Sequence, residues 1–255
     1  MKKKYAKARI HTMDELRGLL VLGMVVHHAL YTIGLVFNTR WAWDGFNWIS
    51  HYLHEIGAAL FILICGISCH LSHSNWQRGL KLAGVAVAMS AVLYFVMPDS
   101  MIWFGVLHCL AVCILLYAGS ARALNKIPAL LALPLWAALA VMTWDLGRWG
   151  GTYIGIPGLF IWDIPQSVAS IKWLMPLGLS PAFGADYFPL LPWLFVFLFG
   201  TVLGRWASER RFPRFMYKKR AAWLSWIGRH SIWIYVAHQP VIYGVCWLVQ
   251  TVFAG

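Results

Sequence analysis

The run from Met13 to Phe37, MDELRGLLVLGMVVHHALYTIGLVF, is long and apolar enough to cross a lipid bilayer as one helix. It nevertheless contains His27 and His28 near its middle. An ionisable side chain at that depth is costly, and it usually marks a place where a membrane protein binds or reacts. The first constraint on the fold is therefore a lipid-spanning helix with histidine inside it.

The composition extends this reading to the whole chain, since 60% of the residues are apolar and only 12% are charged. The net charge is +12, but lysine and arginine gather in short segments between apolar runs, which indicates membrane flanks and argues against a nucleic acid partner. The five cysteines all lie within apolar runs, so we expect packed thiols that form neither disulfides nor a metal site.

Seven apolar runs predict an all-α, polytopic membrane bundle of about seven transmembrane helices in a single domain, 1–255. They cover roughly 16–37, 53–71, 80–97, 102–120, 127–144, 188–204 and 231–251. Gly200 and Gly204 form a GxxxG pair suited to close helix packing. The remaining long connection, 145–187, is rich in glycine and proline and predicts a folded external loop, with an interfacial or re-entrant piece such as 158–162.

The distribution of basic residues predicts the orientation. Of the 21 lysines and arginines, all but Arg40, Arg148 and Lys172 fall on one side of the seven-span arrangement. Because positive residues favour the inner side, we expect a cytoplasmic amino terminus and an external carboxyl terminus. The location that follows is a bacterial inner membrane, with lipid around the spans.

Polar residues inside the spans are the candidates for chemistry. Arg17 and His28 are eleven residues apart, or three helical turns, so they share one face and His28 lies roughly 16 Å further in. His28 is a candidate general base, or alternatively a buried histidine hydrogen-bonded to another helix. His27 points about 100° away and is expected to be structural.

Two further histidines, His108 and His238, reach comparable depth. His238 precedes Gln239 and Pro240, and a proline there frees a backbone carbonyl and predicts a kink. Such breaks often lie beside a polar site, although a tolerated kink with satisfied side chains is the alternative.

The outer ends of the spans hold a second set of polar residues. His51, His54 and Glu55 are expected to form interface hydrogen bonds, because their spacing matches no strong metal-ligand pattern. Asp186 and Tyr187 precede the sixth run and are candidates to bind or deprotonate an external substrate, while Asp186 could equally cap that helix.

Two interpretations are open for the inner segment 205–220, which has the sequence RWASERRFPRFMYKKR. It can set the topology and contact anionic lipid. It can also concentrate a polyanion such as a coenzyme A, whose phosphates suit arginine donors. The sequence has no P-loop or Rossmann glycine pattern.

Six ordered blocks resemble a known family: DELRGLLVLGMVVHH, ALFILICGISCHLS, RGLKL, IWFGVLHCL, DYFPLLPWLFVFLFG and IGRHSIWIYVAHQP. They are similar to bacterial membrane proteins grouped with the catalytic domain of heparan-alpha-glucosaminide N-acetyltransferase, and more distantly to the acyltransferase-3 enzymes. The D-x-L-R-G pattern with a histidine eleven residues after the arginine falls on Asp14, Arg17 and His28.

The resemblance implies transfer of an acyl group, usually acetyl, from cytoplasmic acyl-CoA to an acceptor on the other side of the membrane. In the larger lysosomal relatives an asparagine stands at the position of His28, and their proposed catalytic histidine lies in the segment after the first helix. This chain reads NTRWAWDGFNW there, which has no histidine and leaves Asp44 as a candidate external base.

We therefore predict an acetyl-CoA-dependent membrane acyltransferase without a metal. The amine or hydroxyl of a glycan or amino sugar attacks the thioester, either directly or through an acyl-histidine, and a homodimer is compatible with this reading. The alternatives are a redox protein with b-type haem, and a transporter of protons or small molecules. The candidate catalytic residues are His28, His108, His238 and Asp186, those for CoA are Arg17 and Arg229, and those for the acceptor are Tyr187, Asp44 and Gln239.

Overall fold

The computed structural model describes residues 9–147, 153–181, 186–209 and 212–253. Over these ranges the regular secondary structure is helical apart from one two-stranded sheet, which confirms the all-α prediction. The five cysteines are buried free thiols. Some basic residues that enter the orientation argument lie outside the described ranges, namely Lys2, Lys3, Lys4, Lys7, Arg148, Arg210 and Arg211.

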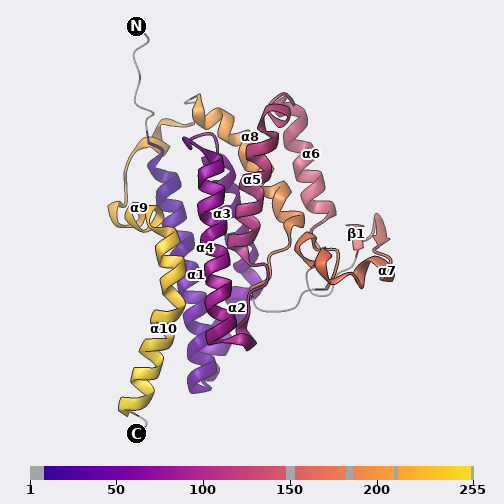
Figure 1. The fold of residues 1–255 in the computed structure, drawn as a ribbon. Helices are drawn as coiled ribbons and strands as arrows, with labels where there is room; N and C mark the ends of the chain where they lie inside the picture. The colour runs from indigo at the N-terminus through magenta and orange to yellow at the C-terminus, as the bar shows by residue number, and fades with distance from the viewer. Residues whose placement is uncertain (1–8, 148–152, 182–185, 210–211, 254–255) are drawn as a thin grey trace. The chain divides into compact units, whose positions relative to one another are not determined.

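Each of the seven apolar runs coincides with a helix, and shorter helices lie between them (Figure 1). The helices are α1 His11–Phe37, α2 Arg40–Tyr52, α3 His54–Ser68, α4 Asn75–Val96, α5 Val106–Leu124, α6 Ala129–Met142, α7 Gln166–Ala169, α8 Leu190–Ser208, α9 Ala222–Arg229 and α10 Ser231–Phe253. Short 3-10 turns occur at Pro98–Ser100, Lys172–Leu177 and Arg214–Tyr217.

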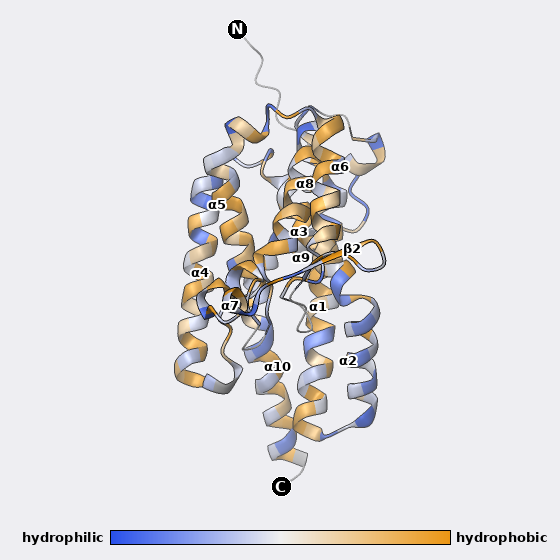
Figure 2. Ribbon diagram, turned by 90° about the vertical axis from the view of Figure 1, so that its right-hand side faces the viewer, coloured by the Kyte–Doolittle hydropathy of each residue, from blue (hydrophilic) through white to orange (hydrophobic). Residues whose placement is uncertain are grey.

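Five of these helices, α1, α4, α5, α8 and α10, are long and apolar enough to cross a membrane. A sixth crossing is formed if α2 and α3, which are bent by 53° at their junction, act as one span. Helix α6 is apolar but has only 14 residues, fewer than a spanning helix usually needs. Figure 2 shows α6 and α8 coloured as hydrophobic along most of their length. The chain is a multi-pass membrane protein by these criteria, and the count of seven stays a prediction.

Residues 38–52, which the seven runs leave as a connection, mostly form helix α2. Trp43, Phe46 and Ser50 follow a helical spacing and lie toward α1, where the ring centres of Trp43 and Phe46 are 5.7 and 5.3 Å from that of Tyr31. The aromatic contacts give this polar segment a buried face. It therefore folds as a helix packed on α1.

The loop before α8 contains a β-hairpin, with strand β1 Tyr153–Ile156 antiparallel to strand β2 Phe160–Asp163. Its turn follows Pro157, and Gly158 has φ 86°, a conformation that suits glycine. Residues 158–162 thus form a hairpin turn and strand in place of a re-entrant piece. All four residues of β2 are exposed, and an interfacial position for this hairpin stays a prediction.

Contacts divide the chain into two compact units. The first comprises Met1–Phe61 and Arg210–Gly255, in which α2, α9 and α10 pack on α1. The second comprises Ile62–Glu209, in which α4 packs on α5 and α8 packs on α5 and α6. In the second unit a side chain on Gly200 would overlap the carbonyl oxygen of Leu63, so α3 and α8 approach closely as the GxxxG pair predicts.

Candidate active site

A tight crossing of α1 and α9 lies at one end of the first unit. A methyl group on Gly18 would overlap the carbonyl oxygen of Leu224, and one on Gly228 would overlap that of Asp14. Only glycine allows the two backbones to approach this closely. The DELRG block near the start of the chain and the IGRH block near its end therefore meet at this crossing.

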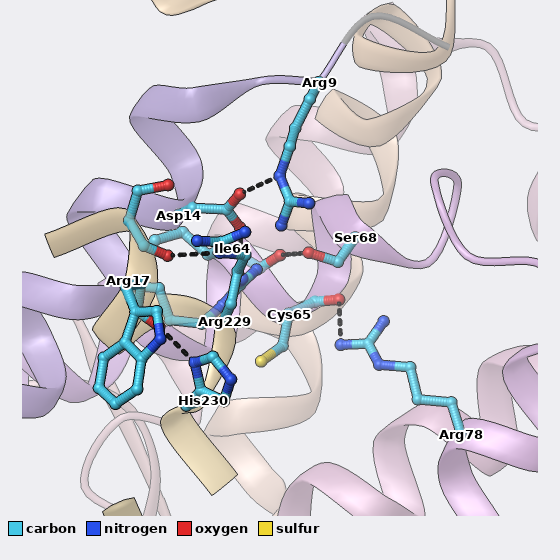
Figure 3. Close-up of polar contacts among 11 residues, drawn as sticks. Arg9, Asp14, Arg17, Ile64, Cys65, Ser68, Arg78, Arg229 and His230 are labelled. Atoms are coloured by element: carbon cyan, nitrogen blue, oxygen red, sulfur yellow. Dashed lines mark hydrogen bonds and ion pairs between the residues drawn. The ribbon is translucent and has the colours of Figure 1, made fainter. Parts of the chain in front are cut away.

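Charged residues surround the crossing, as Figure 3 shows for Arg9, Asp14, Arg17 and Arg229. The buried carboxylate of Asp14 accepts hydrogen bonds from Arg9 Nε at 2.6 Å and from Arg17 Nη1 at 3.1 Å. Arg229 follows Gly228 directly, and its Nε donates to the Ser225 carbonyl at 3.2 Å. Because Gly18 and Gly228 touch, the adjacent Arg17 and Arg229 lie at the same crossing.

A second buried acid fixes the start of α9 against α1. The Glu15 carboxylate accepts the backbone N–H groups of Arg220 at 2.7 Å and of Ala221 at 3.0 Å. These donors lie at the amino-terminal end of α9, where backbone N–H groups have no partner within the helix and negative charge is favoured. Glu15 therefore helps to set the position of Arg229 at the other end of this eight-residue helix.

Further along α1, the sequence-predicted His28 and His238 come together. Their ring centroids are 5.0 Å apart at an interplanar angle of 60°. His238 Nδ1 is hydrogen-bonded to the Tyr235 carbonyl, so this nitrogen must carry the proton and Nε2 must carry the lone pair. Within the described part of the chain, His238 Nε2 is buried and has no hydrogen-bond partner. A buried imidazole lone pair of this kind can accept a proton from a substrate.

Gln239 lies beside this pair on α10. Its Nε2 donates to the Thr32 hydroxyl at 3.2 Å, and Thr32 is fully buried one turn after His28. Gln239 Oε1 is buried and has no partner among the described residues. Helix α10 continues through Pro240 without a break. The first unit thus gathers two predicted catalytic residues and one predicted acceptor-binding residue.

The other face of α1 bears a polar contact that the sequence does not reveal. His27 is buried, its Nε2 lies 2.8 Å from the Ser50 hydroxyl, and its ring stacks on Phe46 with centroids 4.6 Å apart. The ring of His54 lies 5.3 Å from that of His27. Finding these residues from sequence would have required recognising that the segment after α1 is a helix, because Ser50 reaches His27 only through α2.

His108 belongs to the second unit and has a structural set of partners. The backbone N–H of Gly105 donates to His108 Nδ1 at 3.4 Å, and Nε2 lies 3.4 Å from the Ser90 hydroxyl. Ser90 in turn donates to the Ile102 carbonyl at 2.7 Å. Both ring nitrogens are thus engaged around the start of α5. The catalytic role of His108 stays a prediction.

Asp186 and Tyr187 also lie in the second unit. Asp186 has φ 49°, and its carboxylate is close to Gly105, at the start of α5. It does not cap α8, whose preceding residue is Pro189. The Tyr187 hydroxyl donates to the Met175 carbonyl at 2.6 Å, and burial raises the pKa of Tyr187, so this phenol stays a neutral donor.

Asp44 lies on α2 at the surface of the first unit. It pairs with Arg40 at 3.8 Å, and both side chains are mostly exposed, so the interaction is weak. Asp44 is therefore accessible to an external molecule. Across the described residues, no group of three or more His, Cys, Asp or Glu is arranged to hold a metal ion.

The fold and these contacts define the class of protein. It is a multi-pass helical membrane protein with a partly buried histidine pair on α1 and α10, and with arginines at the crossing of α1 and α9. The heparan-alpha-glucosaminide N-acetyltransferase catalytic family matches residues 9–240, and the chain belongs to this family. No curated protein and no solved structure gives a significant match. Family membership marks the protein as an acetyltransferase.

Proposed function

We propose that the protein transfers an acetyl group from cytoplasmic acetyl-CoA to an amine or hydroxyl of a sugar that reaches the site from the other side of the membrane. The observation that carries this proposal is the buried Nε2 of His238, which lies beside His28 and has no hydrogen-bond partner among the residues that the structure describes. An acetyl transfer needs a base that removes a proton from the attacking nitrogen or oxygen, and a neutral imidazole is suited to that role.

His238 acts as the general base. The bond from Nδ1 to the Tyr235 carbonyl fixes the tautomer, and it also stabilises the imidazolium that forms when Nε2 takes a proton. His28, whose ring lies 5.0 Å from that of His238, and Gln239, the next residue on α10, are candidates to orient the acceptor. Acetyl-CoA supplies the activated thioester carbon.

Arg17 and Arg229 bind the phosphates of the donor. Guanidinium groups suit phosphate because they form paired, charge-assisted hydrogen bonds. CoA is a long molecule with its phosphates at one end and its thioester at the other. Three turns of α1, roughly 16 Å, separate Arg17 from His28, so one molecule lying along α1 can reach both residues.

The family name specifies a glucosaminide, and this supports a sugar as the acceptor. The basic residues support the orientation, because they favour a cytoplasmic position for Arg17 and an external position for the α1–α2 turn. Asp44, Asp186 and Tyr187 are then candidates to guide a glycan acceptor from outside. A bacterial inner membrane is the location that fits this arrangement.

The test is acetyl transfer by the purified protein in lipid vesicles. Labelled acetyl-CoA is supplied with amino sugars or envelope glycans, and the labelled product is identified. We expect His238→Gln to lower the rate by roughly 10²- to 10⁴-fold, the usual range for a lost general base, while the protein remains folded. The exposed His73 provides a matched control, and His73→Ala should transfer at the wild-type rate.

Two results would contradict the proposal at different points. A wild-type protein that labels no amine or hydroxyl acceptor would remove the transferase assignment. A His238→Gln variant that keeps wild-type turnover would leave the transferase in place and exclude His238 as its base. A haem protein would instead absorb visible light once purified, and a transporter would move its solute without consuming acetyl-CoA.

A further inference from the structure

We propose that His54, Ser50 and His27 form a proton relay that connects the His28–His238 pair to the surface at the junction of α2 and α3. The relay rests on the proposed function, because it removes the proton that acetyl transfer to an amine releases. It assigns a shared task to Ser50, to His27, which the sequence marks as structural, and to His54, for which the sequence predicts interface hydrogen bonding.

The relay is a continuous series of imidazole rings within the first unit. Ring centroids are 5.0 Å apart from His238 to His28, 5.4 Å from His28 to His27, and 5.3 Å from His27 to His54. Two imidazoles joined by one N–H···N bond of about 2.9 Å have centres roughly 5 Å apart. Small ring rotations, or one bridging water, are therefore sufficient to pass a proton between neighbours.

Ser50 supplies a hydroxyl in the same series. Its Oγ lies 2.8 Å from His27 Nε2, and a hydroxyl can accept one proton while donating another. Ser50 lies near the end of α2, and His54 begins α3 one residue beyond the junction, where the two helices bend by 53°. The bend thus brings polar groups from both helices to the same side of α1.

Burial changes along the series in the direction a relay requires. His54 is exposed, His28 and His238 are partly buried, and His27 is only 8% exposed. A proton that leaves His238 therefore passes through the interior and reaches His54, an exposed residue at the junction of α2 and α3. His51, on α2, is also exposed, and its ring makes an edge-to-face contact with Tyr52 at a centroid distance of 4.5 Å.

Acetyl transfer to an amine and acetyl transfer to an alcohol release different numbers of protons, and this difference distinguishes the two acceptor classes. A primary amine arrives largely as R–NH₃⁺ at neutral pH and must lose two protons to become the amide. As the N–C bond forms and the C–S bond breaks, one proton ends on the thiol of CoA and the other is released. An alcohol acceptor forms an ester and a thiol with no net proton released. The relay therefore points to an amino group as the acceptor.

The opposing explanation is that His27 serves only to hold α2 on α1. The variant His27→Gln distinguishes a relay role from a structural role for His27. A glutamine can keep a hydrogen bond to Ser50 but cannot take up and release a proton. His54→Ala gives a second test, since exogenous imidazole can reach an exposed position and replace a proton carrier. His51→Ala is the matched control at the same end of the molecule.

The experiment measures acetyl transfer to an amine and to an alcohol by the full-length protein in vesicles. With the amine, we expect His27→Gln to lower kcat on the order of 100-fold. We also expect imidazole to restore the rate that His54→Ala loses, and His51→Ala to have no effect. With the alcohol, both relay variants should lose much less.

The outcomes separate the relay from the transferase itself. If the wild type transfers acetyl and His27→Gln does so equally well, the relay is wrong and the transferase stands. The relay is also wrong if imidazole fails to restore His54→Ala while that variant remains folded. A wild type that transfers nothing overturns the proposed function and the relay together.

Discussion

The crossing of α1 and α9 gives a sharp prediction, because a single added methyl group has no space there. In Gly18→Ala the new Cβ would overlap the Leu224 carbonyl and approach the backbone nitrogen of Gly228. These neighbours are main-chain atoms, which cannot rotate away as a side chain can. The two helices must therefore separate, and Arg229 must move away from Arg17.

The loss in free energy of unfolding caused by Gly18→Ala can be measured against a control variant in the same helix. Overpacking costs about 1–3 kcal/mol, while replacing glycine by alanine inside a helix gains up to about 1 kcal/mol. Gly23 also lies in α1, but an added Cβ there meets nothing within 4 Å, so Gly23→Ala measures the helix-propensity gain alone. We expect Gly18→Ala to be less stable than Gly23→Ala by about 1–3 kcal/mol.

The assay is thermal unfolding in one detergent, followed by calorimetric titration of CoA into each variant at a temperature where both are folded. Gly18→Ala should melt earlier and bind CoA at least tenfold more weakly, as loss of one charged hydrogen bond of about 1.5–3 kcal/mol implies. If both variants melt alike and bind CoA alike, the crossing does not hold the arginines in place.

Two further predictions concern the same site. Arg17→Ala or Arg229→Ala should weaken CoA binding more than Lys172→Ala, a substitution of an exposed lysine in the other unit, and equal losses by calorimetry would remove the basis for this phosphate site. With an alcohol acceptor, which releases no net proton, His28→Asn should retain much of the transfer rate, because an asparagine can replace the hydrogen bond by which His28 orients the acceptor. A loss on the order of 10²-fold or more with the alcohol would instead make His28 the base.

Apolar runs made the helices predictable, because a backbone in lipid must satisfy its own hydrogen bonds and long apolar stretches leave only that solution. The placement of Arg17 and His28 on one face could also be predicted from their spacing, since both lie on one helix. The segment 38–52 is polar enough to resemble a connection, although Trp43 and Phe46 recur at helical spacing. The Pro157–Gly158 pair between apolar stretches was the available signal for the hairpin.

The sequence does not predict which distant segments lie side by side, because that depends on tertiary packing. His28 and His238 come from helices at opposite ends of the chain, and no local pattern pairs them. Gly18 and Gly228 carry no visible sign that they face each other. The positions of Asp186 beside Gly105 and of His108 beside Ser90 likewise depend on contacts between segments, which the sequence pattern does not specify.

The most direct test of the account is the sidedness of acetyl transfer. Purified protein is reconstituted in sealed vesicles with one known orientation, labelled acetyl-CoA is confined to the side of Arg17 and Arg229, and an impermeant amino sugar is confined to the other. We expect labelled acetyl-sugar on the far side, with free CoA left on the near side. Transfer only when both substrates share one compartment, or no transfer in either arrangement, would contradict it.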